Sequence, residues 1–134
     1  IIVCEPTSPF TTNLDVDTAI KKLEKNSKKV DAVIAVAENI AGHPKFCVKL
    51  KKNSKVKPYL KKFHRPMRQN LDNIYYYCGN FYLSKVRTLL EKSTFYHDRA
   101  IAIVSERYKA MEIDDPLDLI LAKVIMKSRK YLKK

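Results

Sequence analysis

Two carboxylates two residues apart, Glu112 and Asp114, are the strongest candidates for chemistry in this chain. If residues 110–114 are extended, the alternation of side chains along a strand puts both on one face. Two hard oxygen ligands on one face suit Mg²⁺ bound beside a substrate phosphate. The same spacing is typical of a solvated acidic turn before a helix, and on spacing alone both interpretations stay open.

The segment after these carboxylates predicts a well-defined helix. Asp115 is expected as the N-cap, Pro116 as the first helical residue and Asp118 as the third. Apolar residues then recur at helical spacing and predict one apolar stripe, formed by Leu117, Ile120, Leu121, Val124 and Ile125.

The first part of the chain predicts a strand, a loop, a helix and a second strand. Residues 1–4 read as a fully buried strand, and two prolines make residues 5–12 a loop. Thr12 or Asn13 caps a helix that ends near Lys28, with Asp15 in a capping-box position. The apolar run 32–37 predicts the second strand.

Apolar strands that do not alternate are typical of a parallel sheet covered on both faces. The first four elements therefore predict a βαβ unit with a right-handed crossover. Ligands collect at the carboxyl ends of such strands, which places the loop 5–12 at the edge of a site.

The middle of the chain is more polar. Residues 45–61 predict a hairpin with one wet face, and a basic loop follows at 61–73. Residues 74–83 predict an aromatic strand in which Gly79 marks a bulge, a close backbone approach or a packing accommodation. Ser84 is expected to cap a short helix to Glu91, and a loop and a short strand follow at 95–96 and 101–104. The basic side chains of the loop are Lys61, Lys62, His64, Arg65 and Arg68.

Composition sets the broad class. A chain of 134 residues with 46% hydrophobic and 31% charged residues fits one soluble globular domain, 1–134. Its two glycines exclude a Gly-rich phosphate loop within the segment. Three separated cysteines without metal spacing favour a reducing compartment, so we expect the cytoplasm, and no apolar run is long enough to span a membrane.

The basic excess has two interpretations. Lys and Arg total 27 against 14 Asp and Glu, a formal net charge of +13. A polyanion such as nucleic acid could bind it, but lysines scattered over helix faces and turns favour a solvated surface, so we expect no nucleic-acid partner. Because the chain begins with Ile1 inside an apolar run, we expect it to be a piece of a longer protein.

Five separated motifs resemble one family, the acylneuraminate (CMP-sialic acid synthetase-like) cytidylyltransferases. Residues 4–10 (CEPTSPF) resemble its QPTSPLR loop, and residues 68–71 (RQNL) resemble RRQDLP. Residues 75–82 (YYYCGNFY) resemble YRxNGAIY, and residues 111–119 (MEIDDPLDL) resemble IDIDTPEDL. The turn His43–Pro44–Lys45 matches a recurring HP position. The motifs keep their order along nearly the whole chain.

The resemblance implies a Rossmann-like, nucleotide-diphospho-sugar-transferase-like α/β fold, a three-layer sandwich that is incomplete at the N-terminus. It implies transfer of CMP from CTP to the anomeric hydroxyl of an acidic or acylated sugar, with Mg²⁺ required and pyrophosphate released. It also implies a homodimer, in which the segment 45–75 reaches across to the partner. The family's first strand and its nucleotide-gripping RxGSKxxxxKN loop are absent here, so activity is expected only in a longer chain.

The resemblance also implies residue roles. Glu112 and Asp114 would hold the metal near the attacking hydroxyl, and Arg68 would face the sugar carboxylate or a phosphate. Tyr82, with Phe95 or Tyr96, would line the acyl-sugar pocket. The remaining substrate-binding positions implied by the motifs are Glu5, Ser8, Lys45, Gln69, Cys78 and Gly79.

Four substitutions depart from the family pattern. Glu5 replaces a Gln and would repel a sugar carboxylate, Tyr76 stands where a sugar-binding Arg is usual, and Cys78 replaces an Asn. Glu112 replaces the first Asp of the metal pair but keeps a carboxylate. The changes favour a sugar other than sialic acid, and they leave two alternatives open: a non-enzymatic basic module that binds a polyanion, and a degenerate, non-catalytic family member.

Overall fold

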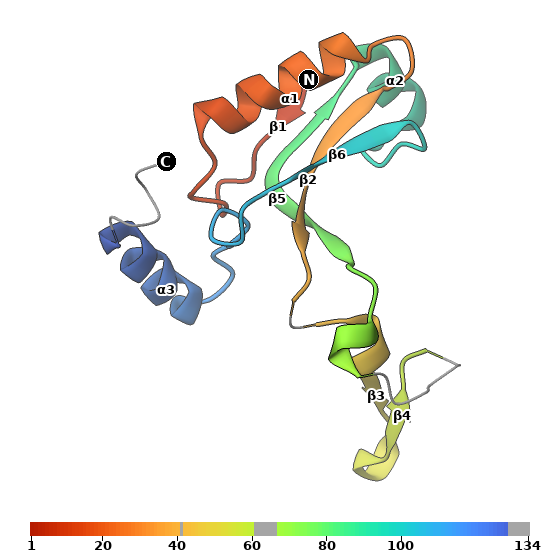
Figure 1. The fold of residues 1–134 in the computed structure, drawn as a ribbon, viewed down its shortest axis with the longest axis vertical. Coiled ribbons are helices and arrows are strands. Elements are labelled where there is room, and N and C mark those ends of the chain that lie inside the picture. Colours follow the sequence, from red (N-terminus) through yellow and green to blue (C-terminus); the bar gives the residue numbers. More distant parts are fainter. Residues whose placement is uncertain (41, 61–66, 129–134) are drawn as a thin grey trace. The chain divides into compact units, whose positions relative to one another are not determined.

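The structure is a computed structural model that describes residues 1–40, 42–60 and 67–128 (Figure 1). The chain divides into two compact units. Unit 1 comprises Ile1–Ala37 and Tyr77–Lys134, and unit 2 comprises Glu38–Tyr76. The predicted hairpin and loop segment, 45–75, falls within unit 2.

A four-stranded mixed sheet forms the centre of unit 1, with the order β1-β5-β2-β6. Its strands are β1 (Ile2–Val3), β2 (Ala32–Glu38), β5 (Tyr75–Ser84) and β6 (Ala100–Val104). β1 pairs antiparallel with β5, and β2 pairs parallel with β6. The predicted α/β class is confirmed, but the predicted parallel sheet is wrong, because β5 pairs antiparallel with β1 and the sheet is mixed.

Strand β2 carries the core of this sheet. Six of its seven residues are buried, as its continuous apolar run predicts. Val33 packs in one cluster with Phe81 and Cys78 of β5 and Ala19 of the first helix. By contrast, the prediction of a fully buried first strand is wrong. Val3 is 42% exposed, because β1 has only two residues and one neighbouring strand.

Helix α1 (Asn13–Lys25) begins with the predicted capping box, in which Thr12 and Asp15 exchange bonds between side chain and backbone. It ends three residues before the predicted end, because Asn26 turns the chain and its amide side chain caps the Lys22 carbonyl at 2.8 Å. The short helix α2 (Val86–Lys92) has Lys85 as its N-cap. The predicted Ser84 cap is wrong, since Ser84 still belongs to β5.

Helix α3 (Pro116–Lys127) has the predicted N-cap, Asp115, with Asp118 completing a capping box. Its predicted apolar stripe is largely exposed: Leu117 is 61% and Ile120 58% exposed, while Ala122 is buried. None of the helices in the described residues is both long and apolar enough to cross a membrane.

Unit 2 contains the predicted hairpin. Its strands β3 (Val48–Leu50) and β4 (Val56–Pro58) pair antiparallel, with the register Val48 opposite Pro58. The described part of this unit also contains the 3₁₀ turns η1 (Pro44–Phe46), η2 (Lys52–Ser54) and η3 (Arg68–Asn70). Of the predicted basic loop, Lys61, Lys62, His64 and Arg65 lie outside the described residues.

Candidate functional site

Gly79, inside strand β5, is the point where several predicted side chains gather. Its amide donates a hydrogen bond to Glu112 Oε1 at 2.5 Å, and its carbonyl accepts one from the Glu5 amide at 2.9 Å. A Cβ on Gly79 would lie 2.5 Å from Glu5 Oε2 and 2.9 Å from Ser8 Oγ. The structure therefore bears out the packing accommodation, because the side chains of Glu5 and Ser8 occupy the space that a Cβ on Gly79 would take. We call these four residues the Gly79 cluster.

Three aromatic rings in unit 1 form a wall near the cluster. The Tyr82 ring centroid lies 6.1 Å from that of Phe95 and 6.0 Å from that of Tyr96. Burial raises the pKa of the Tyr82 hydroxyl, and the nearby Tyr96, Glu5 and Glu112 raise it further. The hydroxyl thus stays protonated and lies within electrostatic reach of both carboxylates. We call Tyr82, Phe95 and Tyr96 the aromatic wall.

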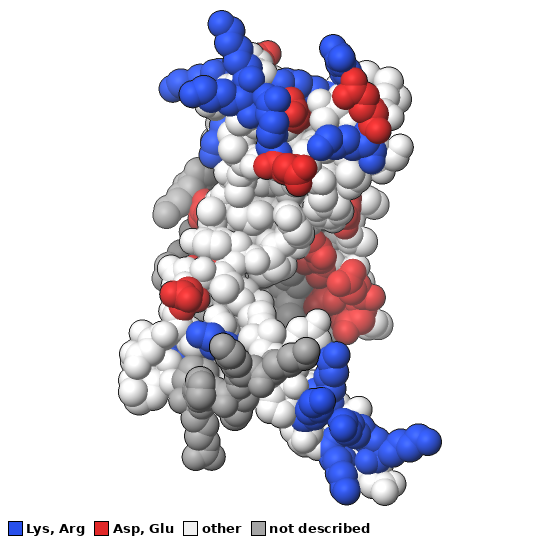
Figure 2. Space-filling view, turned by 90° about the vertical axis from the view of Figure 1, so that its right-hand side faces the viewer, with Lys and Arg blue, Asp and Glu red and all other residues white. Residues whose placement is uncertain are grey.

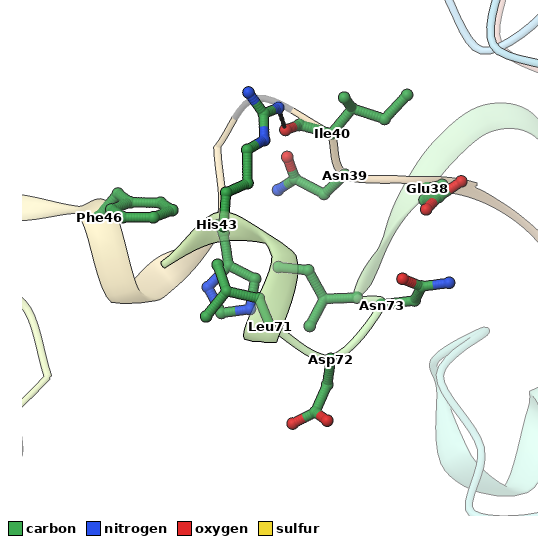
Figure 3. A pocket seen from close by; sticks show the side chains of 10 residues that line it. Glu38, Asn39, Ile40, His43, Phe46, Leu71, Asp72 and Asn73 are labelled. Carbon is green, nitrogen blue, oxygen red and sulfur yellow. Dashed lines mark hydrogen bonds between the residues drawn. The ribbon is translucent and has the colours of Figure 1, made fainter. Parts of the chain in front are cut away.

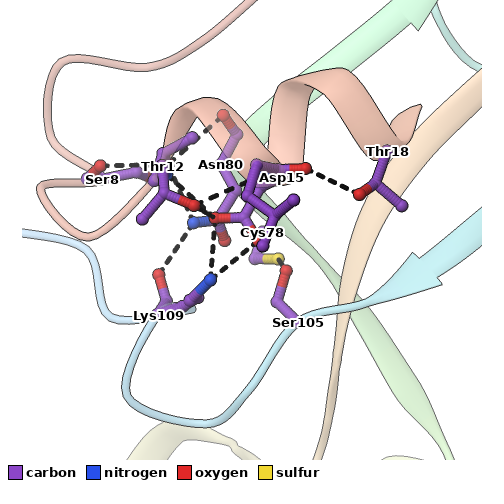
Figure 4. A network of polar contacts seen from close by, with 10 residues as sticks. Ser8, Thr12, Asp15, Thr18, Cys78, Asn80, Ser105 and Lys109 are labelled. Carbon is purple, nitrogen blue, oxygen red and sulfur yellow. Dashed lines mark hydrogen bonds and ion pairs between the residues drawn. The ribbon is translucent and has the colours of Figure 1, made fainter. Parts of the chain in front are cut away.

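The loop between β1 and α1 is held in place by hydrogen bonds to the other segments of the cluster. The Thr7 carbonyl accepts from the Ile113 amide at 2.9 Å. The side-chain amide of Asn80, which is 1% exposed, donates to Thr11 Oγ1 at 2.9 Å and to the Lys109 carbonyl at 2.8 Å (Figure 4). These bonds satisfy both donors of a buried amide and fix the loop against β5.

An ion pair joins the start of α1 to the segment that leads to Glu112. Lys109 Nζ lies 2.8 and 2.9 Å from the two Asp15 carboxylate oxygens, and the Thr12 amide and hydroxyl donate to the same carboxylate (Figure 4). Burial alone would raise the pKa of Asp15, but the bonds from Lys109 and Thr12 outweigh it and lower that pKa.

The remaining predicted residues of unit 1, outside the cluster and the aromatic wall, are Cys78 and Asp114. The Cys78 side chain is buried in the core, where its thiol contacts Ser105 Oγ at 3.9 Å and burial raises its pKa. Asp114 is exposed, and its amide donates to Asp118 Oδ2 at 3.1 Å as part of the start of α3. Of the predicted metal pair, Glu112 therefore belongs to the Gly79 cluster, while the backbone amide of Asp114 forms part of the cap of α3.

Unit 2 holds the other three predicted residues. The Arg68 guanidinium donates to the Ile40 carbonyl at a pocket of about 360 Å³ that His43 and Phe46 also line (Figure 3). The Lys45 amide donates to His43 Nδ1 at 3.1 Å. These predicted residues are Lys45, Arg68 and Gln69, of which Arg68 and Gln69 are exposed.

Two residues that organise the site, Asn80 and Lys109, were not predicted from the sequence. The position of Asn80 could have indicated its role, since an Asn inside an apolar strand must find hydrogen-bond partners. The position of Lys109 gave no such indication, because nothing separates one lysine from the 27 basic residues of the chain.

The oxygen donors of the Gly79 cluster fit a divalent cation such as Mg²⁺, which prefers carboxylate and hydroxyl oxygens. The Ser8 hydroxyl is buried and has no hydrogen-bond partner among the residues that the structure describes. Within that same part of the chain, no group of three or more His, Cys, Asp or Glu side chains is arranged to hold a metal. Any metal here would rest on two carboxylates and a hydroxyl.

No protein-family model matches the chain, and no curated protein sequence matches it either.

Proposed function

We propose that this chain carries the sugar and metal side of a nucleotidyltransferase that moves CMP from CTP to the anomeric hydroxyl of an acylated or acidic sugar. One observation carries the proposal. Residues from three motifs far apart in the sequence, Glu5 and Ser8, Gly79, and Glu112, meet at one point of unit 1. Tyr82 of the aromatic wall lies within electrostatic reach of the same carboxylates.

The reaction follows from what these groups can do. The sugar oxygen forms a bond to the α-phosphorus of CTP, the bond between the α-phosphorus and the bridging oxygen breaks, and pyrophosphate leaves. The hydroxyl proton passes to a carboxylate of the cluster or to water. Bound Mg²⁺ would neutralise phosphate charge, with Glu112 as ligand and Asp114 as the second ligand that the motif implies. The aromatic wall gives an apolar surface for the acyl group.

The mixed sheet supports the finer fold assignment, a nucleotide-diphospho-sugar-transferase-like sandwich. Its buried strand β2 and the helices α1 and α2 are elements that such a sandwich requires. The three described cysteines are free thiols, which supports a reducing compartment such as the cytoplasm.

Activity is expected from a longer protein that supplies a nucleotide-binding loop. Incubation of that protein with CTP, Mg²⁺ and a panel of acidic and acylated sugars should release pyrophosphate with at least one sugar. Replacing Glu112 by Ala should reduce the rate by roughly 10²-fold or more, because charge neutralisation at the phosphate is lost. The matched control is Glu91→Ala on α2, which should keep the rate. No release by the folded protein with any sugar would reject the proposal.

We also propose a homodimer that unit 2 holds together. Leu50 and Val56 of the hairpin are 74% and 64% exposed, an apolar surface that a second copy could cover. Leu50→Glu should shift the protein from dimer to monomer in analytical ultracentrifugation. Leu90→Glu on α2, where Leu90 is 73% exposed, is the control that should stay dimeric. A wild-type monomer at all concentrations would reject the dimer.

A second candidate function is binding of a polyanion by a non-enzymatic module. Basic side chains gather over the unit that holds α1 and again over the β3–β4 hairpin (Figure 2). The basic residues of these elements are Lys21, Lys22, Lys25, Lys49, Lys51, Lys52, Lys55 and Lys57. Binding driven by phosphates should weaken steeply as salt rises. Absence of single-stranded RNA or DNA binding at low salt would leave the transferase as the better candidate.

Substitution of the carboxylates distinguishes a degenerate, non-catalytic member of the family from an active enzyme. If the longer protein is active, and Glu112→Ala or Asp114→Ala removes that activity, the degenerate reading fails. If the folded protein is inactive with every sugar, these substitutions should change only stability and binding.

A further inference from the structure

Ser8 has a buried hydroxyl that no other described residue pairs with. The residue is 5% exposed, and its Oγ has no hydrogen-bond partner in the described residues. That oxygen lies 2.9 Å from the position that a Cβ of Gly79 would occupy, and Glu5 Oε2 lies 2.5 Å from the same position. A buried hydroxyl without a hydrogen-bond partner is destabilising, so it is expected to serve a ligand.

Two carboxylates share this location. Glu112 accepts the hydrogen bond from the Gly79 amide through Oε1, one of its two carboxylate oxygens. Glu5 reaches Gly79 through its side chain and through its own amide. Both side chains are partly buried. Two ionised carboxylates that approach the same residue repel each other.

No basic side chain among the described residues offsets these two charges. The ion pairs in that part of the chain join lysines and arginines to Asp15, Asp31, Glu91 and Asp98. Lys109, the lysine that precedes Glu112 most closely, is bound to Asp15. The two carboxylates therefore need a positive charge from outside the described protein groups.

We propose that Glu5, Ser8 and Glu112 form a divalent-cation site against Gly79, with Glu5 in the role that the sequence pattern gives to Asp114. Three hard oxygen donors suit Mg²⁺ or Mn²⁺, and the remaining positions are left to water and to a ligand oxygen. The site explains why a Glu stands at position 5: a carboxylate there repels an acidic ligand but attracts a cation. The proposal deepens the function proposed above, since it names the ligands of its metal.

Terbium luminescence tests this site directly in the full chain. Tb³⁺ takes hard oxygen ligands, and its emission is sensitised by nearby tyrosines; the chain has eight Tyr and no Trp. Excitation of tyrosine should give saturable Tb³⁺ emission that Mg²⁺ and Mn²⁺ displace. Tyr82→Phe should dim this emission without changing the affinity, because the Tyr82 hydroxyl lies within electrostatic reach of Glu5 and Glu112.

Four variants distinguish the proposed ligands from Asp114. Glu5→Gln and Glu112→Gln should each weaken Tb³⁺ binding by about tenfold or more, and Ser8→Ala by a smaller factor. Asp114→Asn, the ligand that the motif implies, should weaken binding less than Glu5→Gln does, and Glu91→Gln on α2 is the matched control that should stay within about twofold of wild type. Wild-type affinity in Glu5→Gln, or loss of binding in Asp114→Asn alone, would overturn the proposal.

Thermal unfolding gives a second measurement that does not depend on luminescence. Without metal, Glu5→Gln should raise the melting temperature, because it removes one of two repelling charges. Added Mg²⁺ should raise the melting temperature of wild type but not that of Glu5→Gln. If Mg²⁺ stabilises both proteins equally, the cation binds elsewhere and the proposal is wrong.

The outcomes for the site and for the transferase are separable. Tb³⁺ binding that depends on Glu5, together with no CMP transfer by the longer protein, keeps the cation site and rejects the proposed function. CMP transfer with unchanged Tb³⁺ binding in Glu5→Gln keeps the function and rejects Glu5 as a ligand.

Discussion

The two units differ most in how much they bury. Every buried residue among those described belongs to unit 1, whereas none of the described residues between 38 and 76 is buried. Unit 1 surrounds Val33 and Phe81 with apolar side chains, while the hairpin of unit 2 leaves Leu50 and Val56 in solvent. An isolated two-stranded hairpin is marginally stable in water. Unit 1 can therefore hold a site in place by itself, but unit 2 needs a surface to cover it.

The largest effect should come from the core of unit 1. Phe81→Ala removes a ring that is 0% exposed and should lower the free energy of unfolding by about 3–5 kcal/mol. Leu50→Ala in unit 2 should change it by less than about 0.5 kcal/mol, because that side chain is 74% exposed. Urea unfolding measures both. Similar losses for the two variants would mean that unit 2 shares the core of unit 1.

The two glycines give a closely matched comparison. Gly79→Ala should cost roughly 1–3 kcal/mol, because its Cβ would lie 2.5 Å from Glu5 Oε2 and 2.7 Å from Glu5 Cδ. Gly42→Ala in unit 2 places its Cβ no closer than 3.3 Å from Asn39 and should change stability by less than about 1 kcal/mol. Urea unfolding measures the change in the free energy of unfolding for both variants.

A double variant checks the cause of the Gly79 effect. Glu5→Ala should recover part of the stability lost in Gly79→Ala, since it removes the carboxylate that the new Cβ meets. Strictly additive losses from the two changes would contradict the close contact between these residues.

The pH dependence of unit 1 should report on Asp15. Its pKa is lower in the folded protein, so the stability that it contributes is present above its unfolded pKa of about 3.9 and is lost as pH falls through the folded value. Asp15→Asn should cost about 1–2 kcal/mol at pH 7 and progressively less below pH 4 or so. The control is Asp98→Asn, whose side chain is 98% exposed and should show no such window. A constant difference between wild type and Asp15→Asn at all pH values would exclude this role.

The smallest effect is expected in the hairpin. Lys49 Nζ lies 4.9 Å from the Tyr59 ring centroid, an exposed cation–π contact worth about 0.5 kcal/mol. Lys49→Gln should speed hydrogen exchange of the amides in 47–60 by about twofold and leave unit 1 unchanged. Lys57→Gln, on the paired strand, is the control. Slower hydrogen exchange of the unit 1 amides in Lys49→Gln would contradict the independence of the two units.

Local patterns predicted most elements of the fold. The capping boxes at Thr12 and Asp115 depend on residues three apart, and the apolar run of β2 is a property of its own six residues, so each could be read without the rest of the chain. The sheet order could not, because the placement of β5 between β1 and β2 depends on pairings between distant segments. Ser84 was misread for a similar reason: its hydroxyl bonds to His97 Nε2 at 2.8 Å, a partner that sequence does not reveal.

The residues of the candidate site were named from motifs, but their grouping was not. Glu112 was expected to pair with Asp114, its neighbour but one, because spacing along the chain was the available information. Glu5 follows β1, and its amide donates to the Gly79 carbonyl of β5. This contact depends on the register between β1 and β5, which the sequence alone does not reveal. The sequence also could not show that Cys78 faces the core while Gly79 faces the loop.

Unit 2 leaves the sheet from β2 and returns through β5, and these two strands are neighbours. The Asn39 amide donates a hydrogen bond of 2.9 Å to the Ile74 carbonyl, which joins the two ends of unit 2. A short turn joining residue 37 to residue 77 could therefore replace the whole segment without changing the strand order. The entropic cost of closing a loop rises by only about 0.6 kcal/mol for each doubling of the loop's length. This point of the chain can therefore accept insertions and deletions of very different sizes. Relatives of this protein should accordingly vary in length here while keeping the sheet on either side.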